Sequence, residues 1–223
     1  MADTLFLRLE GALQSWGERG RWSVRDSAPE PTKSGVIGLL ACALGRGGDG
    51  DIRALSAALR MGVRVDRPGT RLTDYHTIGG GYAAPALLTA EGKPKQSSGR
   101  PHTEISQRDY LADASFLVAL RGDAALIDEL ARALQRPAWV IFLGRKSCPP
   151  SRPVFAGVGD YDDLEHALRR YDWPPDAAGL TAIVECASGD DAAVRRRDHL
   201  VSRRYRLFEP RYTRAIPLRS EEA

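Results

Sequence analysis

The twelve residues KSGVIGLLACAL at 33–44 constrain the fold most, because as a helix they are apolar on nearly every face. Thr32 is a typical N-cap residue, and Gly45 is a typical residue just beyond a helix C-terminus. A helix that is apolar all round must be covered on most of its surface. The chain has 223 residues, of which 43% are hydrophobic, and this is enough to build a core around that helix.

The segments around this helix alternate between period-two and helical patterns. Strands are predicted at 4–10, 62–66 (GVRVD), 114–120 (ASFLVAL) and 138–144 (AWVIFLG). Two more helices are predicted at 51–60 and from Asp123 to the residue before Pro137. The resulting order is β-α-β-β-α-β, which is typical of an α+β, ferredoxin-like (RRM-like) domain.

One long segment interrupts this order. Residues 67–113 show no repeating apolar face and include EGKPKQSSGRP at 91–101, so we expect them to project from the sheet. After residue 155 the sequence predicts a helix near 162–170, a strand at 179–186 and an Arg-rich segment at 195–208. The predicted organisation is therefore a ferredoxin-like domain over 1–155 and a small C-terminal lobe over 156–223.

Charge and cysteine usage exclude several classes of protein. The formal net charge of +3 is too small for a uniform polyanion-coating protein, although local basic patches remain compatible with phosphate binding. The cysteines at 42, 148 and 186 form no CxxC or Cys/His cluster, so neither a zinc site nor a disulfide framework is predicted. Arg8 interrupts the first apolar run, which excludes a signal peptide or membrane span there. We expect a reduced, cytoplasmic protein without a cofactor.

The segment FLGRKSCPPSRP at 142–153 carries a glycine followed by two cations. It does not fit a P-loop, because Lys146 does not directly follow the glycine and Pro149 and Pro150 lack amide donors. Gly144 allows close backbone approach, and Arg145 and Lys146 supply positive charge for an RNA backbone. A purely structural turn with exposed cations is the alternative that these residues leave open.

Two other motifs permit both a binding and a structural interpretation. Lys33, Ser34 and Gly35 lie in the first turn of the buried helix, where free amides favour an anion; alternatively the glycine is small so that the helix packs closely. In QSWG at 14–17, Gln14 offers hydrogen bonds and Trp16 offers stacking on a base; alternatively Trp16 belongs to the core.

Catalytic signatures are weak in this sequence. Metal-independent RNA cleavage needs a general acid and a general base near the 2′-hydroxyl group, and Tyr75, His76 and Lys146 are the candidates. The four histidines at 76, 102, 166 and 199 are scattered, and no metal-binding carboxylate cluster or Ser/His/Asp signature occurs. A catalytic role is therefore not the default interpretation.

Several stretches, taken in order, resemble one known family. They are LFLRLEGALQSWG, PTKSGVIGLLACALG, DYHT at 74–77, RDYLADASFLVAL at 108–120 and FLGRKSCP at 142–149. Together they are similar to the CRISPR-associated RAMP family, specifically the CasD subunits of the type I-E Cascade complex. The resemblance covers most of 4–155, and this ordered co-occurrence favours the RNA-binding interpretation of FLGRKSCP.

The resemblance implies a non-catalytic, crRNA-binding subunit of a ribonucleoprotein complex for antiviral DNA surveillance. In that family the subunit caps the 5′ handle of the guide RNA, and an inserted β-hairpin thumb, here at about 77–107, reaches toward the adjacent backbone subunit. The large subunit docks nearby, and target DNA is recognised mainly through guide pairing in the assembled complex. Relatives in another CRISPR subtype process precursor CRISPR RNA, so a metal-independent endoribonuclease is the alternative.

The resemblance also implies which residues bind the handle, by their match to the family's motifs. No catalytic or metal-binding residue is predicted. The expected RNA-binding residues are Gln14, Trp16, Lys33, Ser34, Gly35, Tyr75, His76, Arg108, Gly144, Arg145, Lys146, Ser147 and Cys148.

Overall fold

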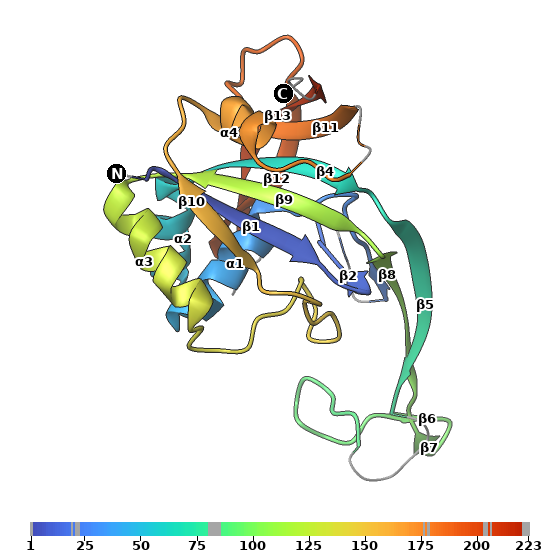
Figure 1. The fold of residues 1–223 in the computed structure, drawn as a ribbon. Coiled ribbons are helices and arrows are strands. Elements are labelled where there is room, and N and C mark those ends of the chain that lie inside the picture. The colour runs from blue at the N-terminus through green and yellow to red at the C-terminus, as the bar shows by residue number, and fades with distance from the viewer. Residues whose placement is uncertain are drawn as a thin grey trace.

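The computed structural model describes residues 2–18, 20, 23–79, 86–175, 177, 179–202, 205 and 207–219. It is a mixed α+β structure in which one large sheet has helices on both faces (Figure 1). The spatial order of the seven strands is β10 (Phe155–Gly159), β1 (Thr4–Glu10), β9 (Ser115–Arg121), β4 (Arg60–Arg67), β11 (Gly179–Glu185), β13 (Leu207–Arg219) and β12 (Val194–Ser202). Each neighbouring pair of strands in this sheet runs antiparallel.

The four helices of the described ranges are α1 (Lys33–Leu44), α2 (Asp49–Ala58), α3 (Ala124–Gln135) and α4 (Leu164–Arg170). They confirm the helices predicted at 33–44, 51–60, 123–136 and 162–170, with shifts of one or two residues at several ends. None of them is both long enough and apolar enough to cross a membrane.

Alternation along β1 divides the core between the two faces of the sheet. Leu5, Leu7 and Leu9 pack with α1, α2 and α3, whereas Phe6 packs with α4. Successive side chains of a strand point to opposite faces, so this division follows from the sequence pattern. Each fully buried side chain of this kind contributes about 1.5–3 kcal/mol relative to an exposed one.

Helix α1 begins and ends where the sequence predicts. The Thr32 side chain accepts a hydrogen bond from the Gly35 amide, 3.3 Å away, and Gly45 adopts a left-handed conformation with φ of 68°. Most residues of α1 are buried, including Val36, Ile37 and Leu40. The prediction that this helix is covered on most faces is therefore confirmed.

The strand predicted at 138–144 is wrong. This segment instead follows the C-terminal end of α1, where the amides of Ala138 and Trp139 donate to the carbonyls of Ala43 and Cys42. The edge of the sheet beside β1 is occupied by β10, which begins eleven residues after residue 144. A short apolar run does not by itself distinguish a strand from a segment that packs against a helix end.

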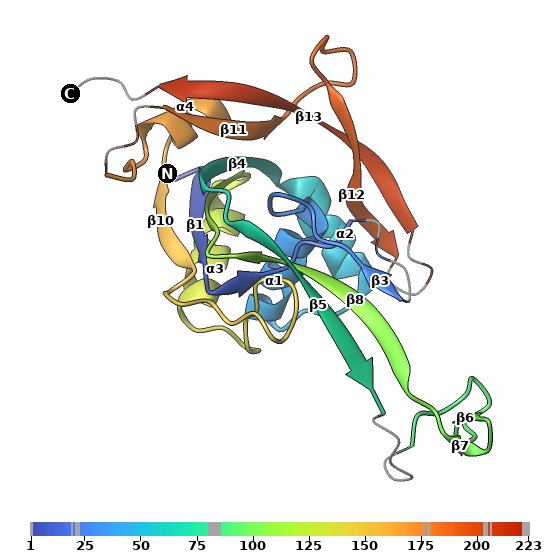
Figure 2. The same ribbon diagram turned by 90° about the vertical axis from the view of Figure 1, so that its right-hand side faces the viewer.

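A long hairpin projects from the sheet (Figure 2). Its two strands, β5 (Thr70–Ile78) and β8 (Glu104–Ala112), pair antiparallel over their whole length. We call β5, β8 and the described residues between them the arm; its outer part carries the short strands β6 (Gln96–Ser97) and β7 (Arg100–Pro101). The thumb insertion was predicted at 77–107, and its residues 80–85 lie outside the described residues.

At its base the arm joins two short strands, β2 (Leu13–Gln14) and β3 (Val24–Arg25), which both pair with β8. Residues from 155 onward add β10 to one edge of the large sheet and β11, β13 and β12 to the other. The strand predicted at 179–186 is confirmed as β11. The division of the chain into domains at residue 155 stays a prediction.

Candidate RNA-binding site

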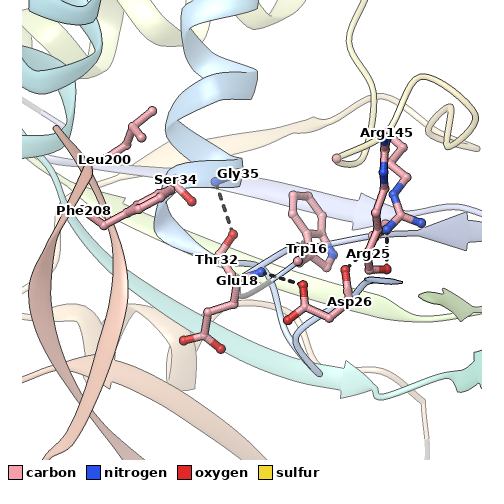
Figure 3. Close-up of a pocket in the computed structure, with 14 residues that line it drawn as sticks. Trp16, Glu18, Arg25, Asp26, Thr32, Ser34, Gly35, Arg145, Leu200 and Phe208 are labelled. Atoms are coloured by element: carbon pink, nitrogen blue, oxygen red, sulfur yellow. Dashed lines mark hydrogen bonds between the residues drawn. The ribbon is translucent and has the colours of Figure 1, made fainter. Parts of the chain in front are cut away.

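A cavity of about 590 Å³ lies where three of the predicted motifs meet. It is bounded by the residues after β2, by the first turn of α1, by the loop after α3 and by the β12–β13 pair (Figure 3). The predicted residues at its wall are Trp16, Ser34, Gly35, Gly144 and Arg145. The fold therefore brings together segments that are far apart in the sequence, and we call this space the central cavity.

Trp16 is buried in the wall rather than exposed for stacking. Its side chain is 1% exposed, and its indole nitrogen donates to the Gln14 side chain, 3.1 Å away. Gln14, also buried, donates in turn to the carbonyls of Leu9 and Ala114 at 3.1 and 2.8 Å. These two side chains join the end of β1 to the start of β9, which supports the core alternative for Trp16.

The two glycines at the wall have internal packing roles. A Cβ atom on Gly35 would lie 2.8 Å from the Trp16 ring, so the small residue lets α1 approach that ring. Gly144 has φ of 92°, and a Cβ atom there would lie only 1.7 Å from the Ser15 carbonyl oxygen. Close packing of the chain on itself is thus sufficient to require glycine at 144.

An internal carboxylate occupies the N-terminus of α1. The Lys33 amide donates to Asp198 from β12 at 2.8 Å, and the Arg211 guanidinium binds the same carboxylate through two hydrogen bonds. Burial works to raise the pKa of Asp198, but Arg211 and the Lys33 amide hold the pKa below its ordinary value. The Lys33 ammonium group also has internal partners, because it donates to the Leu59 carbonyl and pairs with Glu185.

Arg145 links the central cavity to the base of the arm. Its guanidinium donates to the Asp109 carbonyl at 3.0 Å and to the Arg25 carbonyl at 2.8 Å, and it lies over the Tyr110 ring. Ser147 is exposed and approaches the Tyr110 hydroxyl group, at 3.4 Å. The loop at 144–148 is therefore attached to β8 by several contacts at once.

The remaining residues of this loop differ in exposure. Lys146 is exposed at the surface, whereas Cys148 is fully buried. Burial raises the pKa of the Cys148 thiol, so it stays protonated near neutral pH. Lys146 is thus the cation of this loop that is most accessible to a phosphate group.

Tyr75, His76 and Arg108 lie on the arm. Tyr75 is 64% exposed, and His76 is partly exposed with its Nδ1 atom 3.1 Å from Asp74. Because Tyr75 and His76 are successive residues of β5, they point to opposite faces of the arm. This arrangement does not place Tyr75 and His76 side by side as an acid–base pair.

Several residues at the cavity were not predicted from the sequence. Arg25 is exposed and is the register partner of Arg108 in the β3–β8 pair, so two cations lie on neighbouring strands. Glu18 and Asp26 add carboxylates to the wall, and Leu200 and Phe208 add an apolar surface from β12 and β13 (Figure 3). These two apolar residues lie in the Arg-rich segment at 195–208, whose sequence does not indicate that it reaches this cavity.

The described residues include no group of three or more His, Cys, Asp or Glu side chains arranged to hold a metal ion. Hydrogen-bond acceptors lie at Glu18 and Asp26, a hydroxyl group lies at Ser34, and cations lie at the rim.

Comparison with known proteins places this geometry in a family. Residues 4–215 match the family model described as "CRISPR-associated protein (Cas_Cas5)". The CRISPR system Cascade subunit CasD of Escherichia coli (strain K12) is 34% identical over 186 residues, which cover 77% of this chain and 78% of that protein.

Two solved structures are also similar. A chain of a structure described as "CRISPR RNA-guided surveillance complex" has a TM-score of 0.81 and 34% identity, and the match covers 97% of this chain and 90% of that one. A structure described as "Crystal structure of Cas protein" has a TM-score of 0.71 and 38% identity, with 98% and 96% coverage. The resemblance to CasD proteins is confirmed, and the chain belongs to the CRISPR-associated Cas5 family.

Proposed function

We propose that the chain is a non-catalytic, crRNA-binding subunit of a CRISPR Cascade complex and that it grips the 5′ handle of the guide RNA. The observation that carries the proposal is the convergence of three separate motifs on the central cavity, in a chain similar to the Cascade subunit CasD. The proposed partners are the crRNA handle, the backbone and large subunits and, through the assembled complex, target DNA. A protein with these partners is expected to work in the cytoplasm.

The walls of the central cavity favour a nucleobase over a phosphate group as its occupant. Glu18, which pairs with Arg196 at 3.2 Å, and Asp26 present carboxylate oxygens that accept hydrogen bonds from exocyclic amino groups of bases, whereas a phosphate group offers them no such donor. Leu200 and Phe208 offer an apolar surface for an unstacked base. Phosphate groups are then expected at the rim, near the exposed side chains of Arg25 and Lys146.

The buried members of the predicted set act indirectly in this proposal. Gln14, Trp16, Lys33 and Cys148 hold the wall in place through internal contacts, and Arg145 holds the loop against β8. Direct contacts are assigned to Ser34, Lys146, Ser147 and Arg108, together with Tyr75 and His76 on the arm. Gly35 and Gly144 also act indirectly, by allowing close packing of the wall, so a direct RNA contact is assigned only to accessible side chains.

We also propose that β1, α1, β4, β9, α3 and β10 form a ferredoxin-like unit that carries the arm as its thumb. The antiparallel spatial order β10-β1-β9-β4 supports this assignment, because it places the first and third strands of a β-α-β-β-α-β unit at the centre. The residues from α4 onward would be an addition to that unit.

The test is incubation of the purified chain with end-labelled precursor CRISPR RNA in the presence of a chelator, with gel shift and RNA length both measured. A shift without shortening, lost when the handle sequence is scrambled, is the expected result. Cleavage at one site beside the handle that His76→Ala abolishes would make the chain a processing endoribonuclease. An equal gel shift with the native and the scrambled handle would exclude recognition of the handle sequence.

A further inference from the structure

A second cavity, of about 480 Å³, lies on the α4 side of the large sheet. Arg8 and Glu10 line it from β1, and they alternate with Leu7 and Leu9, which face the opposite helices. Its far wall is the segment at 171–175, which follows α4. The lining residues of this cavity are distinct from those of the central cavity, and we call it the lateral cavity.

One carboxylate in the lateral cavity is fully used by the chain. Asp66 is almost completely buried and pairs with both Arg8 and Arg64. Arg64 is itself buried, and it also donates to the carbonyls of Leu168, Tyr171 and Asp172. These contacts fix the floor of the cavity. Because Arg8 and Arg64 both pair with Asp66, neither is assigned to ligand binding.

Two other guanidinium groups are more exposed and less fully paired, although the Nε atom of Arg67 donates to the Asp113 carbonyl at 2.5 Å. Arg67 and Arg152 come from distant parts of the sequence and both face Glu10, each at 3.9 Å, which is longer than a hydrogen bond. Glu10 already accepts a hydrogen bond from Ser115 at 2.9 Å. The side chains of Arg67 and Arg152 are 56% and 58% exposed. Among the described residues, no hydrogen bond is made by the Arg152 guanidinium.

The opposite wall is apolar and rigidly held. The Tyr171 hydroxyl group donates to the Ala156 carbonyl at 2.8 Å, and the Trp173 indole donates to the Arg169 carbonyl at 2.7 Å. Arg64 lies 5.3 Å from the centre of the Trp173 ring, and Pro174 and Pro175 continue the wall. Fixed aromatic and proline side chains beside arginines are typical of surfaces that bind proteins.

We propose that the lateral cavity is a docking site for an extended segment of a neighbouring protein subunit, in which an Asp or Glu carboxylate binds between Arg67 and Arg152. This inference rests on the proposed function, because it takes the chain to work inside a multisubunit complex. A guanidinium group can bind a carboxylate through two parallel hydrogen bonds, and a second guanidinium group nearby adds further positive charge. The lining contains three acids, Glu10, Asp66 and Asp172, and three arginines. Because these charges balance, the cavity has no excess positive charge to attract a polyanion such as RNA.

Chemical cross-linking tests the contact directly. The full chain carrying Arg67→Lys and Arg152→Lys keeps both charges and introduces amines that a water-soluble carbodiimide joins to carboxylates in contact. In the complex assembled with its guide RNA and partner proteins, we expect amide links from position 67 or 152 to an Asp or Glu of another protein chain. An intrachain link to Glu10 serves as the internal positive control, and Arg53→Lys on the exposed face of α2 is the matched negative control.

Charge reversal provides the second readout. Arg67→Glu with Arg152→Glu is expected to lower the affinity for one protein subunit at least about tenfold, since like charges at an interface repel. Handle affinity in the gel shift should stay unchanged, and far-ultraviolet circular dichroism checks that the variant folds. Links to Glu10 alone, with unchanged subunit content, would overturn the proposal.

The two proposals fail in different ways. A fall in handle affinity on charge reversal, with all subunits retained, would show that the lateral cavity binds RNA and would also overturn the docking proposal. If the wild-type chain binds no handle but still forms the interchain links, the proposed RNA function is wrong and the docking site stands.

Discussion

The guanidinium group of Arg145 lies 4.7 Å from the centre of the Tyr110 ring. Arg145 belongs to the loop after α3, and Tyr110 belongs to β8, so this contact joins the wall of the central cavity to the base of the arm. The same guanidinium donates to backbone carbonyls of β3 and β8. An arginine that the sequence suggests as a phosphate ligand is therefore committed to holding two parts of the fold together.

Replacing Arg145 should consequently lower stability. Arg145→Ala removes charge-assisted hydrogen bonds and the ring contact, so we expect a loss of about 2 kcal/mol in the free energy of unfolding. Urea unfolding at constant m-value measures this loss. Arg145→Lys should recover only part of it, because an ammonium group lacks the planar fork.

Arg132→Ala is the matched control for this effect. Arg132 lies on α3, is 69% exposed and pairs with Asp128 one helical turn away, so its loss should cost about 0.5 kcal/mol or less. An Arg145→Ala variant as stable as Arg132→Ala would refute the structural role of Arg145.

Lys146 should behave in the opposite way. It is exposed, so Lys146→Ala should leave the free energy of unfolding unchanged but weaken binding to the RNA handle. If it contacts one phosphate group, the slope of log affinity against log salt should fall by about 0.7–1. Lys146→Arg should preserve both affinity and slope. A loss of affinity that does not depend on salt would argue against a phosphate contact.

Gly144→Ala should be strongly destabilising. The new Cβ atom would meet the Ser15 carbonyl oxygen at 1.7 Å, and the φ of 92° is itself unfavourable for alanine. Either the loop or the end of β2 must move, and we expect a cost of about 3 kcal/mol or more in thermal or urea unfolding.

Gly92→Ala separates the cost of a positive φ from the cost of the close contact with Ser15. Gly92 on the arm also has a positive φ, of 78°, but a Cβ atom there would meet no atom within 4 Å. It should therefore cost about 1 kcal/mol, the part due to backbone conformation alone. Equal losses at 144 and 92 would mean that the approach to Ser15 is not the dominant cause.

The sequence was most informative where local signals agree. Thr32 and Gly45 bracket α1 because capping depends on residues within one turn of the helix ends. The same reasoning misplaced the strand beside β1, because AWVIFLG has the composition of a strand whereas FAGVG at 155–159 does not. Pairing with β1, a long-range contact, determines which of the two joins the sheet.

The candidate site shows a similar limit. Motif resemblance identified the three segments that meet at the central cavity, but it did not reveal that Trp16 and Lys33 are buried. The burial of Lys33 depends on Asp198 and Glu185, which lie more than 150 residues away in the chain. Leu200 and Phe208 were missed for the same reason, since β12 and β13 reach the cavity only through tertiary packing.

Asp198 provides a prediction about pH. Arg211 and the Lys33 amide hold its pKa in the folded state below the ordinary value, despite burial. A depressed folded-state pKa means that the stabilisation is present above the unfolded pKa, near 3.9, and is lost as pH falls through the folded value. Asp198→Asn should therefore cost about 3 kcal/mol near neutral pH, since it leaves buried Arg211 with only the longer contact to Glu185, at 3.5 Å. The difference from the wild type should shrink below about pH 4.

Urea unfolding between about pH 2.5 and 6 measures this difference. Asp3 and Asp109 also have lowered pKa values, but they titrate in both proteins and cancel in the comparison. Asp128→Asn, at a 67% exposed position, is the control and should give a curve nearly parallel to that of the wild type. If the gap between wild type and Asp198→Asn stays constant across this range, the carboxylate does not act as the internal anion of α1.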